Sequence, residues 1–102
     1  MILFGYFKGL PYQRATEAFE DYEKLKNTIP KERVIAHISS LEPALASPPS
    51  LDIFTGEPLR TGLYIDGDFR FPLEFLHYYQ KYDIGIPYAY EAYLKGILGN
   101  TD

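Results

Sequence analysis

The spacing of hydrophobic residues changes twice along this chain of 102 residues, and that change most narrows the folds available to it. Residues 51–71 place apolar and polar positions in near alternation, broken by glycine and proline turn signals, a pattern typical of short antiparallel strands. On both sides, apolar residues instead recur every three to four positions, as they do on the buried face of an α-helix. Because strands and helices do not alternate along the chain, an α+β fold is predicted and a doubly wound parallel sheet is disfavoured.

The predicted sheet is a small antiparallel meander of about three strands within residues 51–71, which residues 2–7 could join as a fourth strand. About four helices from both ends of the chain are expected to pack on one face of it. Their expected bounds are residues 13–29, 31–41, 72–82 and 87–98. The nearest alternative is a mostly helical protein with one hairpin.

The stretch 44–50 contains two prolines and two serines and offers no periodic apolar face. It is interpreted as a loop that crosses the surface. The segments before and after it would each hold about fifty residues, which is marginal for an independent core. We therefore predict one domain that spans residues 1–102.

The net charge is −4, and the acidic excess lies in residues 51–102, which carry eight acidic and four basic residues. Lysine and arginine are few and scattered, so direct binding to nucleic acid is not expected. The chain has no cysteine, which excludes a disulfide framework and a thiolate nucleophile. Residues 1–12 lack the basic start of an export signal, and no stretch approaches the roughly 20 apolar residues of a membrane helix. We expect a soluble cytoplasmic protein with no cofactor and no membrane partner.

Asp66 and Asp68 flank Gly67 between two apolar runs and come closest to a chemical motif. The simplest interpretation is the tip of a hairpin, because aspartate and glycine both suit turns. A two-residue turn beginning at Asp66 would satisfy turn preferences. A three-residue loop would instead place Ile65 opposite Phe69, and we favour this loop because it gathers apolar side chains on one face.

The alternative is a divalent-metal site built from Glu57, Asp66, Asp68 and His77. Such a site would suit a small metal-assisted hydrolase that uses Asp66, Asp68 and a histidine. The sequence contains no nucleophile elbow, no His-Glu-x-x-His motif and no glycine-rich phosphate loop. No catalytic residue is therefore assigned, and an enzyme is the less favoured class.

The two histidines are expected to have structural or surface roles. His37 lies at the edge of an apolar helical stripe, where a neutral ring held by one hydrogen bond is common. His77 has Glu74 three residues before it and Lys81 four residues after it, which predicts a solvated helix face.

Tyrosine is the most abundant aromatic residue, with ten copies, six of them within residues 78–93. A helix pair of that size cannot bury all six, because each phenol needs water or a hydrogen-bond partner. Tyr78, Tyr82 and Tyr88 are expected to be exposed. The alternative interpretation is that the rings fill the space between helices and sheet, with only their hydroxyl tips at water.

Together with Asp66 and Asp68, the exposed tyrosines would form an acidic face made by the hairpin tip and the last two helices. Tyrosine is enriched at protein interfaces, and negative charge favours a basic partner. The sequence therefore favours a small non-enzymatic protein, accessory or inhibitor-like, that binds another protein. Self-association into a homodimer through the same face is a further hypothesis.

Overall fold

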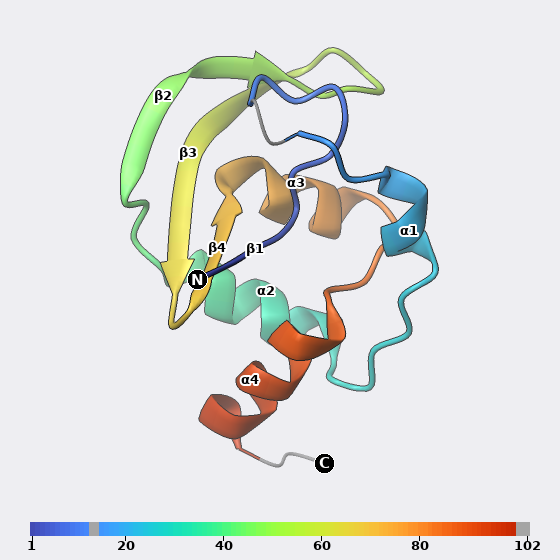
Figure 1. Cartoon of the computed structure of the whole chain (residues 1–102), viewed down its shortest axis with the longest axis vertical. Helices are drawn as coiled ribbons and strands as arrows, with labels where there is room; N and C mark the ends of the chain where they lie inside the picture. Colours follow the sequence, from blue (N-terminus) through green and yellow to red (C-terminus); the bar gives the residue numbers. More distant parts are fainter. Residues whose placement is uncertain (13–14, 100–102) are drawn as a thin grey trace.

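A computed structural model describes residues 1–12 and 15–99 of the chain, and the described residues form four strands and four helices (Figure 1). In chain order these are β1 (Ile2–Leu3), α1 (Phe19–Glu23), α2 (Lys31–Ser39), β2 (Leu45–Leu51), β3 (Pro58–Asp66), β4 (Phe69–Pro72), α3 (Leu73–Lys81) and α4 (Tyr88–Leu98). The predicted α+β class is confirmed. Among the described residues, no helix combines the length and the apolar character needed to cross a membrane.

The four strands form one mixed sheet in the order β1-β4-β3-β2. The pairs β2–β3 and β3–β4 are antiparallel, as predicted for a meander, whereas β1 joins β4 in parallel. Helix α3 packs against β3 and β4, and α2 packs against α3. Helix α4 lies below α2 in the view of Figure 1, and its Tyr90 packs against Phe69 of β4 with ring centroids 5.0 Å apart. The predicted helices at 31–41, 72–82 and 87–98 correspond to α2, α3 and α4.

Strand β2 occupies most of the stretch that was predicted to be a loop, so that prediction is wrong. It is an edge strand paired with β3, and its register shifts between Ser47 and Ser50, where the two prolines lie. Proline lacks a backbone donor and is tolerated in a sheet only at such edges and irregularities. The strand predicted to begin at Leu51 is instead a turn, because Asp52 binds the backbone N–H groups of Phe54 and Thr55.

The helix predicted at 13–29 is much shorter in the structure, where the described part contains only α1. Residues before it pair with the N-terminal segment: Glu17 forms a parallel bridge with Phe7, and its carboxylate accepts the backbone N–H of Tyr6 at 2.8 Å. Residues after it are fixed by Asn27, whose side chain accepts the N–H of Ile86 at 2.8 Å. These long-range contacts outweigh the local helical preference of an amphipathic sequence.

The hairpin between β3 and β4 has a register that differs from both predicted ones. Its two-residue turn is Gly67–Asp68, so Asp66 pairs with Phe69 and Ile65 pairs with Arg70. Of the two turn residues, only Gly67 has a positive φ, +61°, which suits the first central position of a type II′ turn. The turn therefore begins one residue later than expected, and Asp66 becomes the last residue of a strand with its side chain buried.

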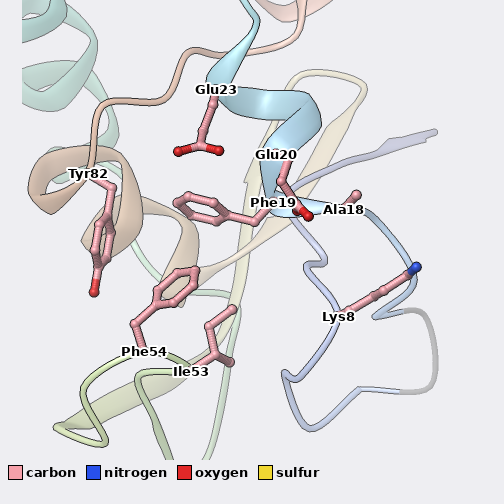
Figure 2. Close-up of a pocket in the computed structure, with 8 residues that line it drawn as sticks. All are labelled: Lys8, Ala18, Phe19, Glu20, Glu23, Ile53, Phe54 and Tyr82. Carbon is pink, nitrogen blue, oxygen red and sulfur yellow. The ribbon is translucent and has the colours of Figure 1, made fainter.

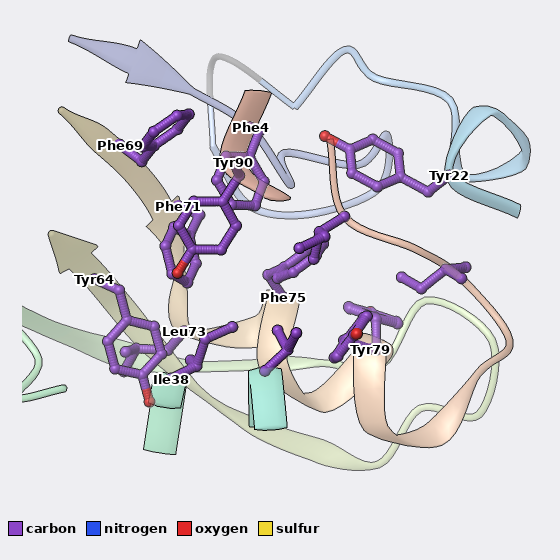
Figure 3. Close-up of a cluster of buried hydrophobic side chains, with 14 of the residues drawn as sticks. Phe4, Tyr22, Ile38, Tyr64, Phe69, Phe71, Leu73, Phe75, Tyr79 and Tyr90 are labelled. Carbon is purple, nitrogen blue, oxygen red and sulfur yellow. The ribbon is translucent and has the colours of Figure 1, made fainter. Parts of the chain in front are cut away.

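Aromatic rings form much of the core. Phe71 stacks on Phe4 with ring centroids 4.7 Å apart and contacts Tyr90 at 5.4 Å, and Figure 3 shows the three rings gathered beside the sheet. Tyr78 is also fully buried, against the expectation that it is exposed, because its hydroxyl accepts the backbone N–H of Ile53 at 2.9 Å. A buried phenol costs little free energy once its hydroxyl has a partner.

Tyrosine hydroxyls also pair with carboxylates, some near in sequence and some far from it. Tyr22 donates to Glu17 at 2.8 Å, and Tyr12 donates to Glu74 at 2.8 Å. Glu74 was expected on the outer face of its helix but is almost fully buried, and burial raises its pKa despite this hydrogen bond. The alternative interpretation of the tyrosines, as filling between helices and sheet, thus describes several of them.

Candidate functional site

A cavity of about 450 Å³ lies between α1, the turn at 52–57 and the C-terminal end of α3 (Figure 2). It combines apolar and aromatic side chains with three charged ones at its edges. The lining residues are Lys8, Ala18, Phe19, Glu20, Glu23, Ile53, Phe54 and Tyr82. Its volume lies within the range of about 300–1,000 Å³ that is usual for ligand pockets.

Phe19, Phe54 and Tyr82 contact one another and form one side of this cavity, here called the aromatic wall. The ring centroids of Phe54 lie 4.9 Å from those of Phe19 and 5.1 Å from those of Tyr82. The Phe19 and Tyr82 centroids are 5.6 Å apart. Phe54 is nevertheless 55% exposed, which is unusual for a phenylalanine and leaves a free aromatic surface at the cavity.

The buried carboxylate of Asp52 holds the aromatic wall in place from behind. Its Oδ1 accepts the backbone N–H of Phe54 at 2.7 Å and that of Thr55 at 3.1 Å. The hydroxyl of Tyr82 donates to both carboxylate oxygens, at 3.2 and 3.1 Å. Asp52 therefore fixes the hydroxyl of Tyr82 and the backbone that carries Phe54, which partly orders the wall before any ligand binds.

Hydrogen bonding also keeps Asp52 ionised. Burial alone would raise the pKa of this carboxyl, but the hydrogen bonds from His77, from the backbone of Phe54 and Thr55, and from Tyr82 outweigh burial and lower it to about 2. A carboxylate that accepts several such bonds is stabilised in its charged form.

The charges at the mouth of the cavity are unevenly placed. Glu20 and Glu23 lie on or at the end of α1, are exposed, and border the wall on the side of Phe19 (Figure 2). Lys8 stands on another edge, and its ammonium group points away from the rings (Figure 2). The space in front of the aromatic wall is therefore bordered by negative charge.

Asp52 also takes part in a second group of polar side chains. The Nε2 of His77 lies 2.7 Å from its Oδ2 and 3.8 Å from Oε1 of Glu57. Glu57 in turn forms an ion pair of 2.6 Å with Lys81. His77 was expected to face solvent beside Glu74 and Lys81, and that expectation is wrong, because the turn at 52–57 folds over it and supplies the two carboxylates.

The predicted metal set is separated in the structure. Among the described residues, Glu57 and His77 gather with Asp52 rather than with Asp66 or Asp68. Asp66 is buried elsewhere, with its Oδ2 2.8 Å from Nε2 of His37. This contact gives His37 the structural hydrogen bond expected for it, but Asp68 does not complete a three-ligand group with the pair.

The predicted protein-binding face is also dispersed. Asp66 accepts hydrogen bonds from Tyr90 and Tyr93 in the interior, and Tyr78 is fully buried, so neither contributes to the surface. Asp68 is exposed at the hairpin turn. Tyr82 is half-buried in the aromatic wall. Tyr88 is 55% exposed, and its hydroxyl accepts the backbone N–H of Lys26 at 3.1 Å.

Sequence reasoning missed Phe19, Phe54 and Asp52 as members of a site. Alternation placed Asp52 and Phe54 in a strand, whereas an aspartate followed by Thr55 and Gly56 is also a signal for a capped turn. That signal would have located the turn, although not its neighbours. Comparisons with known proteins return no match for this chain, whether with protein-family models, with curated proteins or with solved structures.

Proposed function

We propose that this chain is a small non-enzymatic binding protein whose cavity at the aromatic wall receives a cationic side chain from a basic protein partner. The observation that carries the proposal is an exposed phenylalanine, Phe54, packed with Phe19 and Tyr82 beside two exposed carboxylates. This refines the predicted acidic, tyrosine-bearing face and moves it from the hairpin tip to the cavity.

Arginine and lysine suit the cavity for two physical reasons. Their apolar stems cover ring surface, and their charged heads are attracted to the faces of aromatic rings. The carboxylates of Glu20 and Glu23 lie at the edge where such a head group would emerge. An acidic or neutral side chain could contact the rings but would not be attracted by the two carboxylates.

The charge of the whole chain acts in the same direction. A net charge of −4 and an isoelectric point near 5.1 attract basic partners and repel acidic ones before contact. Such steering raises the association rate more than the final affinity and weakens as salt is added. Because Asp52 already fixes the Tyr82 hydroxyl and the backbone of Phe54, less ordering remains to be done on binding.

Binding of a hexa-arginine peptide, followed by NMR, tests the proposal. The ring resonances of Phe19, Phe54 and Tyr82 should shift on titration, and a hexaglutamate peptide should leave them unchanged. Phe54→Ala should weaken binding roughly fivefold, the equivalent of a cation–π contact of about 1 kcal/mol. Combining Glu20→Gln with Glu23→Gln should weaken binding further and reduce its dependence on salt.

The chain supplies matched controls. Tyr88 is as exposed as Phe54 but lies outside the cavity, so Tyr88→Ala removes an equal exposed ring and should leave the affinity unchanged. Asp68→Asn removes one exposed carboxylate outside the cavity and should likewise leave the affinity unchanged. Equal losses in Phe54→Ala and Tyr88→Ala would refute the cavity as the binding site. Concentration-dependent sedimentation without peptide would identify a second copy of the chain as the occupant instead.

A further inference from the structure

We propose that Asp52, Glu57 and His77 bind a divalent transition-metal ion of the zinc class. One imidazole nitrogen and two carboxylate oxygens are offered, and the three ligand atoms all lie within 4.8 Å of one another. Imidazole and carboxylate are both ordinary ligands of zinc and of the neighbouring divalent metals. The proposal is independent of what occupies the aromatic cavity.

The separations between the three side chains suit a common metal ion. In a tetrahedral site with bonds of about 2.0–2.2 Å, ligand atoms lie roughly 3.3–3.6 Å apart. The Nε2 of His77 is 2.7 Å from Asp52 and 3.8 Å from Glu57, so the two distances bracket this value. The Asp52 and Glu57 oxygens lie at most 4.8 Å apart, so they would have to approach each other by up to roughly 1–1.5 Å for all three atoms to bind one ion.

The backbone holds the two carboxylates ready. Asp52 and Glu57 are the ends of one turn, closed by a hydrogen bond of 2.8 Å from the N–H of Asp52 to the carbonyl of Glu57. The Oδ1 of Asp52 accepts the N–H groups of Phe54 and Thr55. Its Oδ2 lies 2.7 Å from Nε2 of His77 and also accepts the Tyr82 hydroxyl at 3.1 Å. Hydrogen bonds of this kind orient ligand side chains and raise metal affinity.

The site is also open to solvent on one side. A cavity of about 290 Å³ contacts both Glu57 and His77, and Arg60 and Gln80 line it as well. This space can hold a water molecule or a small anion as the fourth ligand. An open fourth position distinguishes such a site from a closed structural one.

Three existing contacts compete with the metal. Lys81 lies 2.6 Å from Glu57, His77 is hydrogen-bonded to Asp52, and the Tyr82 hydroxyl donates to Oδ2 of Asp52 at 3.1 Å. Both Lys81 and Glu57 are exposed, and ion pairs between exposed groups contribute little, so displacing the ammonium is inexpensive. Removing the lysine should therefore strengthen metal binding, whereas removing a ligand should weaken it.

Titration of the chain with Co²⁺, followed by visible absorption, tests the proposal. Tetrahedrally bound Co²⁺ absorbs strongly in the visible range. Competition with Zn²⁺ then measures the affinity for zinc. We expect saturable binding of one ion per chain. His77→Gln and Glu57→Gln should each weaken it by at least about tenfold, and Lys81→Gln should tighten it. His37→Gln changes the other histidine–aspartate pair and should leave binding unchanged.

Near-ultraviolet circular dichroism of each variant shows whether the fold is retained, and zinc-induced shifts of the His77 ring nitrogens give a readout that does not depend on the variants. The proposal fails if the wild-type chain shows no saturable binding in the micromolar to low millimolar range. It fails equally if His77→Gln binds as tightly as the wild type, or if the ring nitrogens of His37 shift in place of those of His77.

Discussion

The substitution Asp52→Asn should remove a component of stability that depends on pH. In the folded chain the pKa of Asp52 is about 2, against an ordinary value of 3.8, because hydrogen bonds from His77 and the turn backbone outweigh the effect of burial. The folded pKa is the lower one, so the unfolded chain takes up the proton first as the solution is acidified. The stabilisation is therefore present above the ordinary pKa and lost as the pH falls towards 2.

The magnitude follows from the two pKa values. At about 1.36 kcal/mol per unit, the difference corresponds to roughly 2.4 kcal/mol at pH 5, and it falls to about 0.4 kcal/mol at pH 2. The side chain of Asp52 is shielded from solvent, so this contribution is little reduced by screening. Asparagine is similar in shape and cannot contribute the ionised form.

Urea denaturation from pH 5 to pH 2 is the measurement, made on the wild type and on Asp52→Asn. The difference between their free energies of unfolding should shrink by roughly 2 kcal/mol across this range. All other carboxylates titrate in both chains, so the subtraction isolates Asp52, and Asp68→Asn controls for the loss of one negative charge. A difference that stays constant with pH would refute the assignment of Asp52 as an ionised, hydrogen-bonded support.

Two further substitutions test the packing around the hairpin. Asp66→Ala removes the acceptor of the buried Tyr90 hydroxyl, so it should lower the free energy of unfolding by about 2–4 kcal/mol in urea denaturation, and a loss below 1 kcal/mol would contradict the described network. Gly67→Ala would bring a Cβ atom within 2.7 Å of the Tyr93 hydroxyl and strain a residue with φ of +61°. Gly67→Ala should therefore lower the thermal midpoint by more than Gly56→Ala. Gly56 also has a positive φ, but no atom lies within 4 Å of a Cβ added there. Equal shifts in the two variants would show that the contact with Tyr93 carries no cost.

The sequence predicted those elements whose periodicity agrees with their tertiary surroundings. Helices α3 and α4 begin directly after Pro72 and Pro87, where proline suits a helix start, and both have a regular apolar stripe. The prediction of a long helix at 13–29 was wrong because Glu17 pairs with the N-terminal segment. The local spacing of apolar residues carries no information about that contact. Strand β2 was not predicted because residue preferences favour a loop in a proline-rich stretch. Those preferences do not show that the stretch pairs with β3.

The candidate site was harder to predict for the same reason. Phe19, Phe54 and Tyr82 are separated by about thirty residues at each step, and only the fold brings them together. The faces of α3 were also misassigned. Glu74 and Tyr78 have polar groups and were placed outside, but each finds a hydrogen-bond partner on another segment and is buried. Sequence periodicity shows where polar side chains fall on a helix. It does not show whether another segment supplies a hydrogen-bond partner that lets such a side chain be buried.

The pairing of tyrosine hydroxyls with carboxylates gives several of the ten tyrosines a role that phenylalanine could not fill. Tyr12, Tyr22 and Tyr90 each place a ring in or against the apolar interior while the oxygen at its far end fastens a segment that is 62, 5 or 24 residues away. In a chain without cysteine, these hydrogen bonds link segments that no disulfide connects. Replacing the three tyrosines with phenylalanine would keep the shape of the interior and remove the links.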